Sequence, residues 1–185
     1  AFLDHDDLWS PEYLKNAALA LKNEPSDCII SRLDYLRGDK IEPFRNPHGH
    51  ITIENILIAN PGITGSNLII SKDVFFKLRG FDPKLPPSED KSLILEALLN
   101  NFKIKTLPQN QALWRAHGTT PRLTDAAKMA EGIFQFTRKY RGLMNKKQYF
   151  TNWQKIYAHR RAAGKKSAYL QYLSTRILLI FLKLF

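Results

Sequence analysis

Short apolar runs alternate with helical patterns up to about residue 117, and this alternation limits the possible folds more than any other feature. Strands are expected at residues 28–36, 66–70, 103–107 and 112–115. Helices are expected at residues 11–23, 53–59, 72–78 and 88–100. Strands interleaved with helices in this way predict an α/β layer structure.

Two of these helices have boundaries that the sequence marks clearly. Ser10 and Pro11 predict a helix start, with Ser10 as the N-cap and Pro11 at the first helical position. Gly80 is expected to end the helix that begins near Lys72, because glycine accepts the left-handed backbone at a helix C-terminus. Residues 37–50 contain two glycines and two prolines, so we expect a loop there.

The last third of the chain differs from the rest in pattern and in charge. From residue 123 onward the pattern is helical, with breaks near Gly142 and Gly164. Residues 1–121 carry 14 Lys and Arg against 15 Asp and Glu, whereas residues 122–185 carry 14 against 2. We therefore expect an α/β domain at residues 1–121 and a basic, amphipathic helical region at residues 122–185.

Two further features bear on the context of the chain. The single cysteine, Cys28, excludes an internal disulfide and a cysteine-cluster metal site, and it fits a reducing compartment. The chain begins at Ala1 with an apolar and then acidic stretch that does not have the pattern of a signal peptide. We interpret the sequence as a fragment that begins just before the end of a buried strand.

Three carboxylates, those of Asp4, Asp6 and Asp7, lie directly after the apolar start of the chain. Like charges this close are costly unless a cation or a basic group neutralises them. Hard oxygen ligands at the end of a strand suit Mg²⁺ or Mn²⁺ that bridges a diphosphate. An acidic turn in which Asp7 caps a helix explains the same residues, and the spacing alone leaves both interpretations open.

A second acidic pair, Glu89 and Asp90, follows a proline-rich loop at residues 80–88. The pair stands at the expected start of a helix, where the helix dipole would stabilise one carboxylate as a cap. The other carboxylate could face a cleft and act as a general base. Capping by itself also accounts for the pair.

A basic pair, Arg115 and His117, ends the last expected strand. Side chains two residues apart on a strand point to the same face. Arg115 suits phosphate binding, and a neutral His117 suits a metal or a phosphate oxygen; a surface histidine without a ligand is the alternative. Trp9 and Trp114 flank this region, and either sugar stacking or core packing explains them.

The order of these motifs closely resembles glycosyltransferase family 2, which has the GT-A fold. The resemblance covers about residues 1–118. It rests on Leu3-Asp4-His5-Asp6-Asp7, on Gly65 to Ser71, on Gly80-Phe81-Asp82 through Ser88-Glu89-Asp90, and on Trp114-Arg115-Ala116-His117. Members of the family carry the first strands and the pocket for the nucleotide base before the acidic motif. The resemblance therefore implies a partial GT-A (Rossmann-like) domain, followed here by a C-terminal helical tail.

The resemblance implies a donor site at the acidic motif. Asp4 and Asp6 would bind a divalent metal, Mn²⁺ or Mg²⁺, with Asp6 the better candidate for direct coordination. Arg115 and His117 would reach the metal or the diphosphate of a nucleotide-sugar donor. The metal would offset the charge that develops on the departing nucleoside diphosphate.

The resemblance also implies the reaction. Asp90 would deprotonate the acceptor hydroxyl, with Glu89 beside it. The expected chemistry is a single in-line displacement at the anomeric carbon with inversion. The acceptor would be a glycan or a lipid-linked glycan in the synthesis of a cell-surface polysaccharide.

Basic and aromatic residues are interleaved through residues 138–166, and the apolar run Ile177–Leu182 follows. This run is far shorter than the ~20 residues that a spanning helix requires. The combination predicts an interfacial helix on an anionic membrane, and hence a cytoplasmic chain held at the inner face of the plasma membrane. A helical cap on the catalytic domain or a truncated transmembrane helix are the alternatives for this region.

A different class of function is also open. An inactive fragment could bind a membrane or a nucleic acid through its basic tail. Basic residues interleaved with aromatic ones also describe a groove for single-stranded nucleic acid, but the sequence contains no nucleic-acid-binding motif, which disfavours that partner.

Overall fold

The computed structural model describes residues 1–44, 51–116, 125–165 and 168–184. The chain divides into two compact units, and each is described by itself. Unit 1 consists of the described residues within 1–56, 60–81 and 93–120, and unit 2 of those within 57–59, 82–92 and 121–185. Two short segments before residue 121 thus belong to the same unit as the C-terminal helices.

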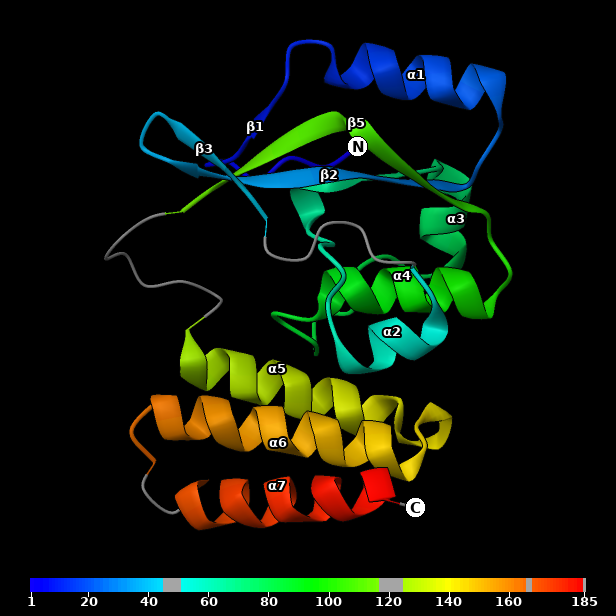
Figure 1. Cartoon of the computed structure of the whole chain (residues 1–185). Helices are drawn as coiled ribbons and strands as arrows, with labels where there is room; N and C mark the ends of the chain where they lie inside the picture. The colour runs from blue at the N-terminus through cyan, green and yellow to red at the C-terminus, as the bar shows by residue number, and fades with distance from the viewer. Residues whose placement is uncertain (45–50, 117–124, 166–167, 185) are drawn as a thin grey trace. The chain divides into compact units, whose positions relative to one another are not determined.

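One mixed sheet of five strands forms the centre of unit 1 in the described part of the chain. Its strands are β1 (Leu8–Trp9), β2 (Cys28–Arg37), β3 (Lys40–Pro43), β4 (Leu68–Ile70) and β5 (Ile104–Arg115). β2 runs parallel to β5 and antiparallel to β3 and β4, and β1 runs antiparallel to β5 (Figure 1). Because three strands pair with β2, this strand organises the sheet.

β2 and β5 pair along most of β2, and this pairing contains a bulge. Most of β2 is buried, as expected for a strand that is covered on both faces. Ser31 pairs with Leu107, but the next residue, Arg32, pairs with Gln111, so residues 108–110 form a bulge. The two strands expected at this point are therefore one irregular strand, and Pro108, which lacks a backbone N–H, lies at its interruption.

The loop expected at residues 37–50 is wrong in its first part. β3 pairs with the end of β2, with Arg37 opposite Lys40, so Gly38 and Asp39 form a two-residue hairpin turn. Gly38 has a φ of 58°, which glycine adopts without steric cost. The glycine therefore marks a hairpin, and residues 45–50 lie outside the described residues.

Helix α1 (Tyr13–Asn23) covers one face of the sheet (Figure 1). The buried side chains of this contact are Tyr13 and Ala17 from α1, and Ile29, Leu33, Leu107 and Ala112 from β2 and β5. Tyr13 and Ala17 are one helical turn apart and so share one face of the helix. This contact forms the core beside the acidic motif.

The start of α1 differs from the expectation. Ser10 does not cap the helix; Glu12 occupies the N-cap position, and it makes no side-chain cap hydrogen bond. The backbone N–H of Ser10 instead donates to the carbonyl oxygen of Gln111 at 3.0 Å. Ser10 therefore prolongs the pairing of β1 with β5, and the helix begins later.

In the sequence, β4 is preceded by η1 (Gly65–Asn67) and followed by α3 (Lys72–Lys77). Ser71 caps α3, because its side chain accepts a hydrogen bond from the Val74 N–H at 3.2 Å. Gly80 has a φ of 68°, which confirms the left-handed end that was expected there. The expected short helix near residue 53 is present as α2 (Ile53–Ile58).

Unit 2 contains three long helices, α5 (Ala126–Lys139), α6 (Lys146–Ala162) and α7 (Ala168–Leu184). α6 lies between α5 and α7 (Figure 1). Asn145 and Gln148 form a capping box at the start of α6. The breaks expected near Gly142 and Gly164 are confirmed, and Gly164 has a φ of 82°.

The loop before α4 (Glu89–Leu99) packs closely on α5 within unit 2. A Cβ atom added at Gly132 of α5 would lie 2.4 Å from Cδ of Pro87 and 3.1 Å from the carbonyl oxygen of Pro86. Only glycine allows this approach of helix and loop. The absence of a side chain at Gly132 therefore allows α5 to pack directly on the loop that leads to Glu89 and Asp90.

We expect Gly132→Ala to lower the free energy of unfolding by about 1 to 3 kcal/mol, because the added methyl group overpacks the contact with Pro87. The matched control is Gly142→Ala, since a Cβ atom there meets nothing within 4 Å. Urea denaturation of both variants measures the difference. Equal stability of the two variants would show that the loop yields without cost.

Candidate functional site

The acidic motif is a tight turn at the edge of the sheet in unit 1. The backbone N–H of Asp7 donates to the carbonyl oxygen of Asp4 at 3.1 Å. The N–H of Asp4 donates in turn to the Ser66 hydroxyl at 3.1 Å. The turn is therefore fixed both within itself and to η1.

Asp7 anchors the turn from inside. The residue is 4% exposed, and its carboxylate accepts hydrogen bonds from the Ser66 hydroxyl at 2.6 Å and from the Arg115 backbone N–H at 2.9 Å. Burial raises the pKa of Asp7, and the nearby charges of Asp6 and Asp4 act in the same direction, against these two hydrogen bonds. The interpretation of Asp7 as a helix cap is therefore wrong: it joins three segments of the chain.

Asp4 and Asp6 have a different environment from Asp7. The Asp4 side chain is exposed and that of Asp6 is half-buried. A Cβ atom at Gly65 would lie 3.3 Å from Oδ1 of Asp4, so glycine leaves room beside this carboxylate. The turn thus keeps one carboxylate inside as an anchor and leaves Asp4 open to solvent.

Arg115 lies beside the same turn at the end of β5. Its Nε donates to the backbone carbonyl oxygen of Asp6 at 2.8 Å. Together with its backbone N–H, which binds Asp7, Arg115 fastens the turn to the sheet. The expected contact of Arg115 with a diphosphate stays a prediction, and His117 lies outside the described residues.

The two tryptophans near the turn are engaged in packing. The Trp9 ring stacks on Tyr13 with centroids 4.5 Å apart, and its Nε1 donates to the Ser66 carbonyl oxygen at 2.7 Å. Trp114 packs against Tyr35, with ring centroids 5.3 Å apart. Both side chains belong to the partly buried shell around the core, as the packing interpretation expects.

The acidic turn fits a divalent cation that is completed by a substrate. Among the described residues, no three His, Cys, Asp or Glu side chains form a metal site by themselves. Mg²⁺ usually keeps several waters and is bound by one or two carboxylates together with substrate phosphates. Asp4, whose carboxylate lies beside Gly65, and Asp6 of the same turn are the carboxylates expected to take this part.

Glu89 and Asp90 begin α4, as the sequence predicts, and they belong to unit 2. The Asp90 carboxylate accepts a hydrogen bond from the Lys91 backbone N–H at 2.5 Å. Asp90 is half-buried, as is Glu89. The structure therefore places the pair in the first turn of a helix, where its dipole favours negative charge.

Lys91, which follows Asp90, is a functional candidate that the sequence did not reveal. It is 6% exposed, and its Nζ lies 3.6 Å from the centre of the Phe136 ring on α5. Burial lowers the pKa of Lys91 to about 7, with a further contribution from the charge of Lys155, whereas Asp90 acts in the opposite direction. Only the fold brings Lys155 and Phe136 to Lys91, so sequence proximity gave no signal.

The sheet and the helix on its face resemble a glycosyltransferase fold. No protein-family model matches the chain, and no curated protein matches its sequence. Among solved structures, the chain is similar to residues 1–349 of the family 2 glycosyltransferase TarS from S. aureus, solved in complex with UDP-GlcNAc. The TM-score is 0.53 and the identity 13%, over 94% of this chain and 64% of the TarS chain.

This likeness is one of fold, and it confirms the expected class: an α/β domain that resembles a partial glycosyltransferase domain, followed by helices. The chain spans 64% of the length of the TarS chain.

We expect Ser66→Ala to destabilise the protein by about 1 to 3 kcal/mol, because the buried Asp7 carboxylate loses its hydroxyl donor. Ser26→Ala is the matched control, since the buried Ser26 hydroxyl has no hydrogen-bond partner within the described chain. Urea denaturation should show a loss for Ser66→Ala alone. A neutral Ser66→Ala would mean that Asp7 does not depend on this bond.

The lowered pKa of Lys91 predicts how the free energy of unfolding depends on pH. Its pKa is about 7 in the folded chain and ordinary, near 10.4, in the unfolded chain, so the unfolded chain binds the extra proton between these values. Stability therefore rises with pH above 7, by up to about 1.4 kcal/mol per pH unit for one proton. Denaturant titrations from pH 7 to 8.5 should show this slope.

Lys91→Met should flatten the slope, whereas Met at the exposed Lys146 should leave it unchanged. The range ends at pH 8.5 because Cys28, whose pKa burial raises to about 12, opposes the trend at higher pH. A slope that persists in Lys91→Met would assign it to another group.

Proposed function

We propose that the chain is the catalytic part of a glycosyltransferase that transfers a sugar from a nucleoside-diphosphate donor. The observation that carries this proposal is the acidic turn, in which a buried Asp7 holds Asp4 and Asp6 at the sheet edge. This turn lies in a fold that resembles that of a nucleotide-sugar glycosyltransferase.

In this proposal Asp4 and Asp6 bind a divalent cation, Mn²⁺ or Mg²⁺, together with the donor diphosphate. The cation, when bound, supplies positive charge to the departing diphosphate. Arg115 keeps the turn in position through Asp6 and Asp7 and adds positive charge beside it. His117 completes the set of residues proposed to reach the metal or the diphosphate.

We assign proton removal from the acceptor hydroxyl to Asp90, with Glu89 beside it. The resemblance in sequence motifs and the half-buried carboxylate of Asp90 support this role. Removing that proton makes the hydroxyl oxygen a better nucleophile for an in-line displacement with inversion. The proton passes to Asp90, the new glycosidic bond forms, and the nucleoside diphosphate leaves.

UDP-GlcNAc is the first donor to test, because the structurally similar TarS was solved with it. The acceptor in this proposal is a glycan or a lipid-linked glycan, and the product is part of a cell-surface polysaccharide. These assignments extend the fold likeness to the chemistry of this chain.

We further propose that the chain works at the cytoplasmic face of the plasma membrane, in peripheral contact with anionic lipid. Within the described chain, no helix is long and apolar enough to cross a bilayer. α7 exposes 73% of Leu170, 56% of Ile177 and 57% of Ile180, which recur at i, i+7 and i+10 along the helix. An apolar stripe in a strongly basic segment fits the interface of an anionic membrane.

The proposal predicts that UDP binds in a Mn²⁺-dependent manner and that Asp6→Ala weakens this binding at least about tenfold, or ~1.4 kcal/mol. Asp39→Ala, in the exposed hairpin turn, is the control for loss of one acidic charge. Calorimetry of the folded chain with and without Mn²⁺ measures both.

The Asp90→Asn variant tests the proposed general base independently of the donor site. We expect UDP binding to stay unchanged, whereas transfer from UDP-GlcNAc or another active donor falls by about 10²–10⁴-fold. UDP binding that Asp6→Ala leaves intact contradicts the metal role. A folded chain that binds lipid vesicles and no UDP would favour the alternative of an accessory membrane-binding module.

A further inference from the structure

One face of α5 holds the segment at residues 82–92, which carries Glu89 and Asp90. Both belong to unit 2. Four contacts reach the segment from α5 and from the residue that follows it, and they come from Gly132, Phe136, Lys139 and Tyr140. These contacts fall at positions i, i+4, i+7 and i+8, so they share one side of a helix.

A buried hydrogen bond joins this face to the first turn of α4. The Ser92 Oγ and Tyr140 Oη atoms are 2.6 Å apart, and both residues are buried. Because solvent does not reach either side chain, water does not replace the bond if one partner is removed. The bond therefore ties the first turn of α4 to the end of α5.

Two further contacts flank this bond. Nζ of Lys91 lies 3.6 Å from the centre of the Phe136 ring, and that ring packs on Tyr140 with centroids 4.7 Å apart. At the start of the segment, Nζ of Lys139 lies 3.0 Å from Oδ2 of Asp82. An ion pair that is partly exposed contributes little. The buried contacts at Lys91 and Ser92 are therefore the ones that hold the segment.

Asp90 shares this helical turn with Lys91 and Ser92. Its carboxylate accepts a hydrogen bond from the Lys91 backbone N–H at 2.5 Å. The first N–H groups of a helix have no acceptor within the helix, so contacts with other elements decide how a first turn is oriented. A misplacement of about 1 Å at a reacting group can cost ~10²-fold in rate.

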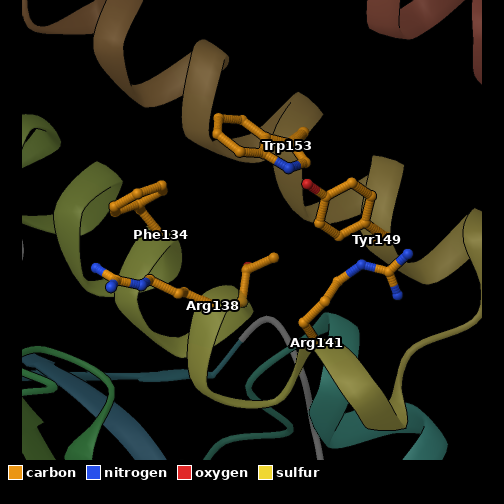
Figure 2. A pocket seen from close by; sticks show the side chains of 6 residues that line it. Phe134, Arg138, Arg141, Tyr149 and Trp153 are labelled. Atoms are coloured by element: carbon orange, nitrogen blue, oxygen red, sulfur yellow. The ribbon is translucent and has the colours of Figure 1, made fainter.

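The opposite face of α5 has a different environment. Figure 2 shows side chains of α5 and α6 around a hollow of about 250 Å³. Its lining includes Phe134, Thr137 and Arg138 of α5 and Tyr149 of α6, and no residue of segment 82–92. A change at Tyr149 therefore alters the surroundings of α5 away from this segment.

We propose that Tyr140 is a positioning residue for the general base that the proposed function assigns to Asp90. The Tyr140 hydroxyl holds Ser92, and the backbone of the same turn holds the Asp90 carboxylate in one orientation. Tyr140 acts through Asp90 and takes no part in proton transfer itself. The effect on catalysis rests on the proposed function, whereas the effect on the placement of Asp90 does not.

The first test follows the Asp90 carboxylate by two-dimensional NMR of the whole chain. The Lys91 amide proton is bonded to this carboxylate, so its chemical shift changes when acid protonates Asp90. Tyr140→Phe removes the hydroxyl and keeps the ring beside Phe136, and Ser92→Ala removes the other partner. Each should reduce the change at Lys91 at least twofold.

The double variant of Tyr140 and Ser92 should show no larger effect than either single variant, because both remove the same bond. If Tyr140→Phe fails to fold, Ser92→Ala carries the test. Tyr149→Phe is the matched control, since it removes a tyrosine hydroxyl at the hollow and leaves segment 82–92 untouched. It should leave the change at Lys91 as it is in the original chain.

The second test measures transfer from UDP-GlcNAc or another active donor. Tyr140→Phe should lower kcat at least tenfold at an unchanged KM for the donor, because the base is displaced and the donor site is not. A loss of stability by itself does not lower kcat in samples that are fully folded. Tyr149→Phe should keep the original kcat.

Three results would overturn the inference. The first is a change at the Lys91 amide that stays the same in folded Tyr140→Phe and Ser92→Ala. The second is an equal reduction in Tyr149→Phe, and the third is an unchanged kcat in Tyr140→Phe. A chain that shows the expected NMR effect but no transfer with any donor would refute the proposed function and support the placement of Asp90 by Tyr140.

Discussion

The buried carboxylate of Asp7 is the interaction on which the rest of unit 1 depends. Asp7 is only 4% exposed, and a buried carboxylate is costly unless hydrogen bonds replace its water. Its two donors, the Ser66 hydroxyl and the Arg115 N–H, come from η1 and from the end of β5. The need to satisfy this one carboxylate therefore brings three distant segments to one point and fixes the end of β5 against the start of the chain.

The buried Asp7 and its neighbours Asp4 and Asp6 therefore have different roles in the turn. The Asp7 carboxylate stabilises the fold through its hydrogen bonds, and its pKa is raised by burial and by the charges of Asp6 and Asp4. A cation beside the turn would relieve the repulsion that the three carboxylates exert on one another. The same arrangement that costs electrostatic energy in the free chain thus favours the binding of a positively charged partner, which is the physical basis of the proposed donor site.

The sequence predicted elements that depend on local signals and missed those that depend on distant partners. The left-handed Gly80 that follows α3 and the break at Gly164 were expected, because a glycine φ is a local property. The hairpin at Gly38 was missed, since the following loop residues obscured it. The role of Asp7 was missed because its partners lie 59 and 108 residues away along the chain. Lys91 and its Phe136 neighbour were missed for the same reason.

The basic C-terminal region illustrates why net charge alone does not define a partner. On α5 and α6, two arginines and three aromatic rings line a small hollow. On α7, exposed Leu170 and Ile177 form a stripe, which suits an extended surface. The distribution of apolar surface around the positive charges therefore differs between the helices, so one net charge does not predict one kind of partner.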